Sequence, residues 1–289
     1  MDQKLSNSRR EILSKAWMFA AGMVSAGVWK TAEAAKKKFK KKKKAKIPRW
    51  AMVMDLRRCT NVRACTVACK SENKIPLGSW NTVVKEVEIS DWPNVDKEFL
   101  PRICNHCEGD EETGVPPCVK VCPKYPDIRR TYTAPSGDKV SYLGGATYKR
   151  PDGMILVDNT LCIGCGKCLR ECPYGARSFN KLLISGQDPE KNGIAKCTFC
   201  VHRVDNGVAP ACVEACPHRA RIFGDLNDPE SEVSKLMAEF NLLENRDKTT
   251  QWPEMGTMPQ VYYIDPKGVL GHYKVSKDNK EMEFRDLIT

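Results

Sequence analysis

CIGCGKCLRECP occupies residues 162–173 and contains four cysteines in the spacing C-x2-C-x2-C-x3-C-P. This spacing is the ligand run of two-cluster iron–sulfur proteins, in which three thiolates surround one [4Fe–4S] cluster and the fourth ligates another. Gly164 and Gly166 carry no side chain, which lets backbone N–H groups approach the sulfurs closely. Pro173 then turns the chain away from the last ligand. The run therefore predicts a pair of cysteine-bound clusters.

Three related groups hold the remaining cysteines. The second group is Cys104-x2-Cys107-x10-Cys118-x3-Cys122, and the fourth is Cys197-x2-Cys200-x11-Cys212-x3-Cys216, each followed by proline. Both keep the opening and closing spacings of the third group, with a loop before the third ligand. The loop 108–117 is acidic and contains Gly and Pro, so we expect it at the surface. The first group is Cys59-x5-Cys65-x3-Cys69, with Val62 at the position of the second ligand.

This incomplete first group explains the odd number of cysteines. Three groups of four and one group of three account for all 15. A valine side chain cannot bind iron, and because paired groups exchange ligands, only one cluster lacks a ligand. We expect that cluster to be [3Fe–4S]. Two alternatives stay open, a labile [4Fe–4S] cluster with a non-cysteine fourth ligand and an empty site.

Other uses of cysteine fit this pattern less well. A structural zinc ion takes four ligands from nearby C-x2-C pairs and does not need the full run. Complete disulfide pairing would leave one thiol over. Covalent haem requires C-x-x-C-H, but Glu108, Gly166 and Val201 follow the relevant cysteines. The chain also has no G-x-G-x-x-G or P-loop fingerprint. The sequence predicts a subunit that carries electrons and is not itself an enzyme.

The net charge of +11 belongs to the amino-terminal segment. Residues 1–48 contain 14 Lys and Arg against three acidic residues, while the rest of the chain holds 33 of each sign. A nucleic-acid-binding protein normally carries its basic patch on the folded domain. We therefore expect no nucleic-acid partner.

Residues 1–34 have the features of a twin-arginine export signal. Arg9 and Arg10 precede an uncharged stretch at 16–29, which is too short to span a bilayer comfortably, and Ala32-Glu33-Ala34 fits a cleavage site. The alternatives are an uncleaved anchor and an amphipathic helix. Residues 35–48 form a Lys-rich linker, expected to be extended because its charges repel. The sequence predicts a periplasmic or extracytoplasmic protein, exported in its folded state.

Several stretches outside the cysteine groups carry a resemblance to a known family. They are Met54–Cys59, Cys104–Cys107, Tyr148–Gly153, Lys196–Cys200 and Ala220–Asp225. With the cysteine groups, they make residues 49–226 resemble the four-cluster ferredoxin-type subunits of the DMSO and polysulfide reductase family, which includes NrfC-like proteins and the DsrO subunit of the Dsr membrane complex. The resemblance implies an α+β fold of two ferredoxin-like double-cluster modules related by a pseudo-two-fold axis. Residues 124–145 are an insertion relative to the family, and we expect them to be loop-rich.

The resemblance also implies how the groups pair, the first with the fourth and the second with the third. Carried over, the incomplete cluster has three cysteine ligands: Cys59, Cys65 and Cys216. The three [4Fe–4S] clusters have these sets: Cys69, Cys197, Cys200 and Cys212; Cys104, Cys107, Cys118 and Cys172; Cys122, Cys162, Cys165 and Cys168.

Partners follow from the same resemblance. They are an integral-membrane quinone-reactive subunit of the NrfD, PsrC or DsrP type, and either a molybdopterin catalytic subunit or cytochrome subunits. The chain would relay electrons between them within a respiratory complex and associate with the membrane through its partners. The alternative is a free-standing soluble polyferredoxin.

The remaining expectations concern local structure. Trp50–Asp55 and Met154–Val157 are typical of strands leading into cysteine groups. In the extension 227–289, Pro229 predicts a helix start, and the apolar residues at helical spacing are expected in the core: Val233, Leu236, Met237, Phe240 and Leu243. Val261–Ile264 and Val269–Val275 predict a hairpin.

Four further side chains lie next to predicted ligands. His106 and His202 have two interpretations: either they tune a cluster or donate a hydrogen bond to it, or they are ordinary histidines at the surface or next to a ligand. Lys167 and Arg170 also have two interpretations: either their charges raise the potential of a nearby cluster, or their side chains are simply solvated.

Overall fold

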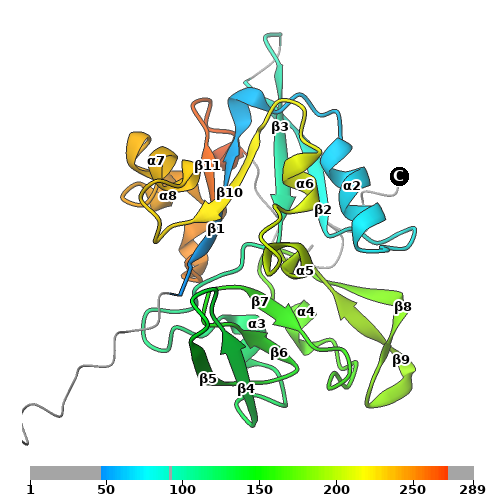
Figure 1. Cartoon of the computed structure of the whole chain (residues 1–289). Helices are drawn as coiled ribbons and strands as arrows, with labels where there is room; N and C mark the ends of the chain where they lie inside the picture. The colour runs from blue at the N-terminus through cyan, green and yellow to red at the C-terminus, as the bar shows by residue number, and fades with distance from the viewer. Residues whose placement is uncertain (1–46, 91–92, 273–289) are drawn as a thin grey trace, which may run out of the picture. The chain divides into compact units, whose positions relative to one another are not determined.

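A computed structural model describes residues 47–90 and 93–272 of the chain. The predicted signal 1–34, the lysines of the linker 35–48 and residues 273–289 lie outside the described ranges. None of the helices within these ranges has the length and hydrophobicity that crossing a membrane requires. The described elements are a mixture of short helices and strands, which confirms the α+β class (Figure 1).

One three-stranded sheet organises the fold. Its order is β10 (Arg221–Asp225), β1 (Trp50–Asp55) and β11 (Val261–Ile264), with β10 antiparallel and β11 parallel to β1. β1 has the predicted boundaries. Its inner residues Ala51–Met54 are fully buried because both faces of the sheet are covered. Since side chains alternate along a strand, Met52 and Met54 face the core that contains the cysteines, while Ala51 and Val53 face a second core.

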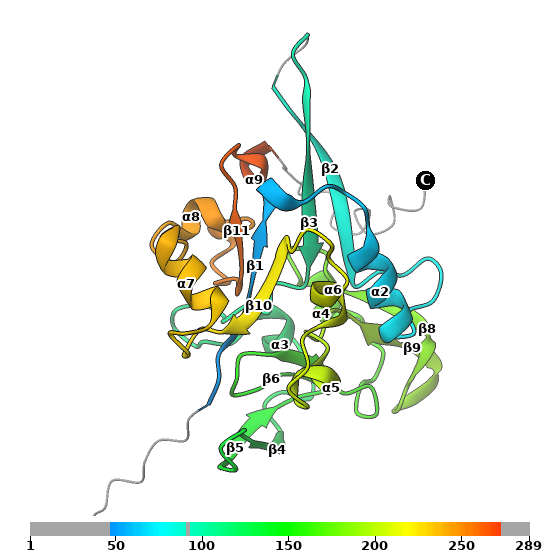
Figure 2. The ribbon, with the colours of Figure 1, turned by 45° about the horizontal axis from the view of Figure 1, so that its top comes forward.

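Helix α7 (Glu232–Glu239) covers the second core, beside α8 (Arg246–Thr249) (Figures 1 and 2). The predicted start at Pro229 is wrong by three residues, because Ser231 caps the helix by accepting a hydrogen bond from the Ser234 N–H at 3.1 Å. Val233 and Met237 are buried, as expected. Leu243 lies beyond the helix and is exposed, so its assignment to the core is wrong.

The predicted carboxyl-terminal hairpin is also wrong within the described residues. β11 pairs with β1, and Val269–His272 form a short helix, α9, in place of a second strand. The Asp265 carboxylate accepts hydrogen bonds from the Val269 and Leu270 N–H groups at 2.9 and 2.8 Å, and so initiates the helix.

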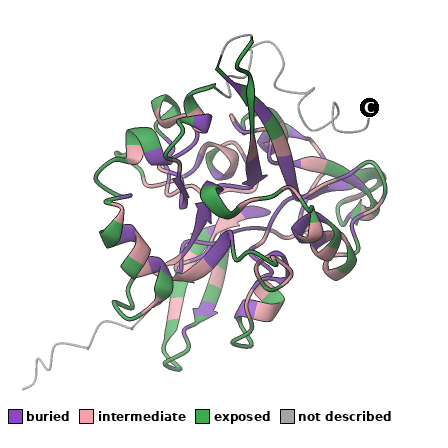
Figure 3. Cartoon of the chain, turned by 90° about the horizontal axis from the view of Figure 1, so that it is seen from above, coloured by how far each residue is buried: buried purple, intermediate pink, exposed green. Residues whose placement is uncertain are grey.

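Four two-stranded ribbons connect the cysteine groups. They are β2 (Thr82–Ile89) with β3 (Asp96–Ile103), β4 (Ile128–Thr133) with β5 (Lys139–Gly144), β6 (Thr147–Lys149) with β7 (Ile155–Val157), and β8 (Ser178–Ser185) with β9 (Asp188–Ala195). β7 confirms the strand predicted at Met154–Val157 apart from its first residue. Buried residues lie inside the fold, and exposed ones gather at the ribbon tips (Figure 3).

The expectation that residues 124–145 are loop-rich is wrong, because β4 and β5 form a regular hairpin within them. Its residues alternate, with Arg130 and Tyr132 turned toward the protein and Arg129 and Thr131 exposed. Gly137 adopts a φ of 83° in the turn that joins the two strands.

Short helices lie within the cysteine groups and carry five of the 15 cysteines. They are α2 (Ala64–Glu72), α3 (Pro117–Lys120), α4 (Lys167–Arg170), α5 (Val201–Val204) and α6 (Ala211–Glu214), with 3-10 turns at Leu56–Arg58 and Pro253–Met255. Helix α2 of the first group packs against α6 of the fourth, and α3 of the second packs against α4 of the third. Cysteines distant in sequence thus lie near one another.

Candidate iron–sulfur sites

All 15 cysteines lie within the described residues, and all are free thiols. Ten are buried and five are partly exposed. Among the described residues, no three His, Cys, Asp or Glu side chains converge closely enough to hold one metal ion. The sulfurs that bind one tetrahedral zinc ion lie within about 4 Å of one another, given a Zn–S bond of about 2.3 Å.

Site 1 is the neighbourhood of Cys59, Cys65 and Cys216, which line one cavity with Val62 and His218. Burial raises the pKa of Cys59, and the nearby thiols of Cys65 and Cys216 raise it further. The Val62 side chain is 60% exposed. His218 is engaged through Nδ1 with the Thr60 hydroxyl at 3.0 Å.

Site 2 contains Cys69, Cys197, Cys200 and Cys212, which also line a single cavity. Burial, with the thiols of Cys212 and Cys200, raises the pKa of Cys69 to about 12. A thiol with so high a pKa stays protonated at neutral pH, so it becomes a thiolate only when a metal replaces the proton.

Sites 3 and 4 are formed by the second and third groups. Cys104, Cys118 and Cys172 lie beside Cys107 in site 3, where burial raises the pKa of Cys172 to about 11. Cys122, Cys165 and Cys168 lie beside Cys162 in site 4. The four neighbourhoods correspond to the four ligand sets given above, and the binding of iron by these thiols stays a prediction.

The sites follow one another in a line. Cys65 of site 1 lies near Cys212 of site 2. Cys197 of site 2 lies near Cys104 of site 3. Cys118 of site 3 lies near Cys168 of site 4.

Backbone conformation places N–H groups against the sulfurs. The residue before the second ligand position adopts a left-handed φ in all four groups: Asn61 (57°), His106 (44°), Gly164 (66°) and Phe199 (53°). In this conformation the Gly164 N–H donates to Cys162 Sγ and the Phe199 N–H donates to Cys197 Sγ, each at 3.4 Å. Such N–H groups stabilise negative charge on sulfur and tune cluster potentials. This contact confirms the expectation that a backbone N–H at Gly164 approaches a cysteine sulfur closely.

Two aromatic rings meet between site 2 and site 3. His106 and Phe199, from the second and fourth groups, stack with their centroids 3.7 Å apart. His106 is fully buried, and burial lowers its pKa well below the ordinary value. Its Nδ1 accepts a hydrogen bond from the Ile155 N–H at 3.0 Å, which leaves the proton on Nε2, a buried donor with no described partner. His106 thus fits a role beside a cluster, and a surface role is wrong.

Other side chains singled out from the sequence are solvated. Lys167 and Arg170 are exposed on α4. The His202 side chain is half exposed, and its Nε2 lies 2.7 Å from Glu72 Oε1. In contrast, three basic residues to which the sequence analysis gave no role, Arg177, Lys196 and Arg221, are buried among the thiols.

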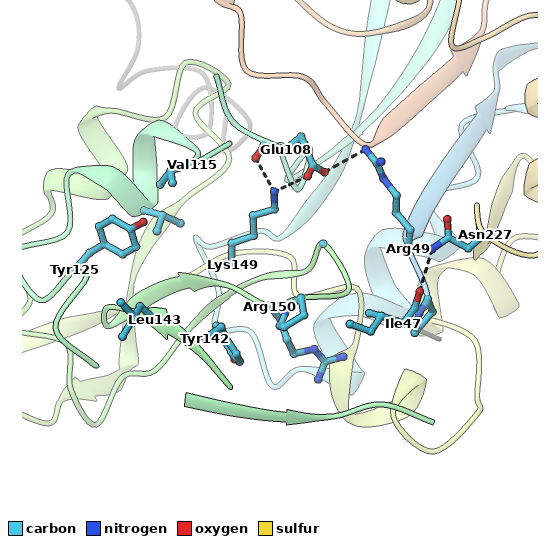
Figure 4. Close-up of a pocket in the computed structure, with 14 residues that line it drawn as sticks. Ile47, Arg49, Glu108, Val115, Tyr125, Tyr142, Leu143, Lys149, Arg150 and Asn227 are labelled. Atoms are coloured by element: carbon cyan, nitrogen blue, oxygen red, sulfur yellow. Dashed lines mark hydrogen bonds and ion pairs between the residues drawn. The ribbon is translucent and has the colours of Figure 1, made fainter. Parts of the chain in front are cut away.

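Ion-paired side chains line a cavity beside residues 124–145. Lys149 Nζ lies 2.6 Å from Glu108 Oε1, and Arg49 contacts the other carboxylate oxygen at 3.2 Å (Figure 4). Lys149 also donates to the Gly114 carbonyl at 3.2 Å. The middle of the loop 108–117 is exposed, as expected. The contacts of Lys149 with Glu108 and with the Gly114 carbonyl fix the loop on both sides of its exposed part. No catalytic constellation is evident among the described residues that line this cavity.

Comparison with known proteins places these sites in context. Residues 95–226 match the 4Fe–4S dicluster domain. A tetrathionate reductase subunit of Salmonella typhimurium is 37% identical over 265 residues, which cover 90% of this chain and 89% of that protein. A selenate reductase subunit of Mesobacillus selenatarsenatis is 37% identical, covering 74% and 71%. The Hdr-like menaquinol oxidoreductase iron–sulfur subunit 1 of Archaeoglobus fulgidus is 34% identical, covering 74% and 82%.

Proposed function

Because the chain belongs to the family of 4Fe–4S dicluster iron–sulfur subunits, as an electron-transfer subunit of an oxidoreductase complex, we propose that it relays electrons through four clusters between a membrane quinone-reactive subunit and the other redox subunits of a respiratory complex. The observation that carries this proposal is the gathering of 15 free thiols into four adjoining neighbourhoods.

Sites 2, 3 and 4 hold [4Fe–4S] clusters in this proposal, and site 1 holds a [3Fe–4S] cluster. When bound, these clusters supply one-electron exchange without proton transfer. The protein provides thiolate ligands, N–H groups directed at sulfur, and a packed apolar core around the thiols that excludes water. The two halves are ferredoxin-like modules related by a pseudo-two-fold axis. The packing of α2 on α6 and of α3 on α4 supports that relation.

The [3Fe–4S] assignment rests on the shape of the first group. Asn61 and Arg63 have φ values of 57° and 56°, close to the 66° and 67° of Gly164 and Gly166 in the complete group. The loop thus keeps a cluster-binding conformation while Val62 offers no ligand. The alternatives are a [4Fe–4S] cluster with a non-cysteine ligand and an empty site. An oxidised [3Fe–4S] signal in the electron paramagnetic resonance (EPR) spectrum of anaerobically isolated protein distinguishes the first possibility from the other two.

Partners follow from the line of sites and from the relatives. Electrons enter and leave a line at its ends, which are site 1 and site 4. The name of the Archaeoglobus relative includes a menaquinol oxidoreductase, which supports an integral-membrane quinone-reactive subunit of the NrfD type as one partner. The tetrathionate and selenate reductase names support a catalytic subunit as another, such as a molybdopterin enzyme, and cytochrome subunits are the alternative.

We also propose that the protein is exported in its folded state by the twin-arginine route to the periplasm or an equivalent compartment. Arg9 and Arg10 provide the signal. Replacing both with Lys should leave the protein in the cytoplasm, detected by cell fractionation. Unchanged export of that variant would overturn the proposal.

Purification from native membranes tests the main function. A respiratory subunit should co-purify with a quinone-reactive membrane protein and contain iron and acid-labile sulfide suited to four clusters. A free-standing polyferredoxin would purify alone, with the same iron content. A preparation rich in zinc would refute iron–sulfur electron transfer itself.

A further inference from the structure

The third and fourth cysteine groups end in the same short pattern. Cys172-Pro173-Tyr174-Gly175-Ala176-Arg177 and Cys216-Pro217-His218-Arg219-Ala220-Arg221 share Cys, Pro, Ala and a final Arg at identical spacing. Long basic side chains are rarely buried unless they are paired. Yet Arg177 is 4% exposed and Arg221 is 2% exposed.

Arg177 lies between sites 3 and 4. Its neighbours are the thiols of Cys104, Cys118 and Cys172 in site 3 and of Cys168 in site 4. One guanidinium nitrogen, Nη1, donates to the Thr147 hydroxyl at 3.4 Å. The other, Nη2, has no described hydrogen-bond partner. An arginine guanidinium stays charged in proteins, so Arg177 places a buried cation beside these thiols.

Arg221 occupies the equivalent place between sites 1 and 2. It lines the cavity of site 1 and neighbours Cys65 of site 1 and Cys212 of site 2. Its Nη2 donates to the Thr82 hydroxyl at 2.8 Å, and the guanidinium group also lies within hydrogen-bonding reach of the Cys212 thiol. The two arginines therefore share their surroundings as well as their sequence pattern. Each donates from one nitrogen to a threonine hydroxyl and has the thiols of two sites beside it.

Lys196 fills the remaining gap, between sites 2 and 3. It is 3% exposed and neighbours Cys197 of site 2 and Cys104 of site 3. Its ammonium group donates to the carbonyls of Ile155 and Cys197.

No ion pair with a carboxylate involves any of these three residues within the described ranges. A buried cation without a counter-charge is strongly destabilising. The groups available to balance these cations are the thiolates of the sites and the metal clusters they bind, which carry net negative charge. The arrangement of burial and unpaired N–H groups thus points to a ligand that is an anion.

We propose that Arg177, Lys196 and Arg221 form a row of buried cations, with one cation in each gap between adjacent clusters. Each cation balances the negative charge of the two clusters beside it and raises their reduction potentials. The inference rests on the proposed function, since it assumes that the thiols bind clusters. Reduction adds an electron and makes a cluster more negative. A nearby cation therefore stabilises the reduced form, and its loss lowers the potential.

The test is a redox titration followed by EPR on the purified complex. Arg177→Met, Lys196→Met and Arg221→Met each remove one cation with little loss of apolar packing. In each variant, we expect two of the four titration steps to move to lower potential and the other two to stay. A tenfold fall in the ratio of reduced to oxidised cluster at fixed potential corresponds to 59 mV for a one-electron couple. Arg221→Met alone should move the step of site 1.

Charge-preserving variants separate charge from shape. Arg177→Lys and Lys196→Arg should load iron normally and shift the potentials less than the Met variants. If a Met variant loses iron while its charge-preserving partner keeps it, the requirement for charge is supported. If both lose iron equally, shape is what matters and the proposal is overturned. Arg219→Met is the matched control, because Arg219 lies two residues from Arg221 but is 71% exposed and paired with Glu232.

The outcomes distinguish the two levels of inference. Wild-type protein without iron and labile sulfide would refute the proposed function. Wild-type protein with clusters, and Met variants whose four potentials match those of the wild type, would overturn only the role of the buried cations. A uniform shift of all four steps would also overturn it, because the structure places each cation between two particular sites.

Discussion

Val62→Cys tests whether the first cysteine group differs from the others by one ligand alone. The left-handed φ values of Asn61 and Arg63 match those around the second ligand of the complete group. A cysteine at position 62 therefore needs no change of backbone to reach the cluster. The Val62 side chain is 60% exposed, so its loss should change the free energy of unfolding by less than about 0.5 kcal/mol.

The expected result is conversion of site 1 from [3Fe–4S] to [4Fe–4S]. The oxidised [3Fe–4S] signal should disappear from the EPR spectrum, and iron should increase by one atom per chain. Because the cluster type and its ligation change at site 1, the potential of site 1 should shift, while the titration steps of sites 3 and 4 stay unchanged.

Val67→Cys is the matched control for this substitution. Val67 lies on α2, four residues from Asn61–Arg63, and is 67% exposed, but it does not occupy a ligand position. Its substitution adds a thiol near site 1 and should leave the spectrum as in the wild type. Retention of the full [3Fe–4S] signal in a stable, fully loaded Val62→Cys protein would refute the interpretation of the first group.

Three further predictions concern stability. Val233→Ala removes buried methyl groups between α7 and the sheet, so it should lower the free energy of unfolding, measured by urea denaturation, by about 2 kcal/mol. Leu243 is exposed, so Leu243→Ala should change that free energy by less than about 0.5 kcal/mol. Equal effects of the two substitutions would contradict the packing described. Lys149→Met removes the ammonium group that holds Glu108 and Gly114, so protease cleavage within 109–116 should become faster, and an unchanged cleavage rate would argue against that anchoring. Removing iron with a chelator leaves the buried cations unbalanced and should lower the melting temperature by roughly 10 °C or more; an iron-free protein with the melting temperature of the loaded one would show that the clusters do not support the fold.

The cysteine loops were predictable because their signal is local. The spacing within one group determines how a short loop wraps a cluster. A glycine at position 164 favours the left-handed φ that the structure shows there. The strand Trp50–Asp55 was predictable for a similar reason, since a run of apolar residues between polar ends specifies a strand buried on both faces.

The hairpin at the carboxyl end was not predictable from its own residues. Val261–Ile264 has the composition of a strand, but its partner is β1, from the other end of the described chain. Nothing in the local pattern distinguishes pairing with a neighbouring segment from pairing with a distant one. Asp265 then gave a helix start where the apolar residues that follow suggested a second strand.

The buried cations were missed for another physical reason. A lysine or arginine in a sequence is normally solvated, and Lys167 and Arg170 follow that rule. Burial of Arg177 and Arg221 depends on which cysteine groups meet around them, which only the tertiary structure shows. The one available signal was the repeated pattern that ends in Arg, and its meaning becomes clear only when both copies are seen between thiol sites.

The conformation of the loops argues that site 1 still has a role. A left-handed φ is strained for residues other than glycine and persists only where the surrounding structure requires it. His106 and Phe199 carry that strain in groups with complete ligands. Asn61 and Arg63 carry it in the group that lacks one, although no thiol at position 62 needs it. A loop that had lost its cluster could relax, so the retained strain, with three thiols and Arg221 around one cavity, favours a site that still binds a cluster over a relic.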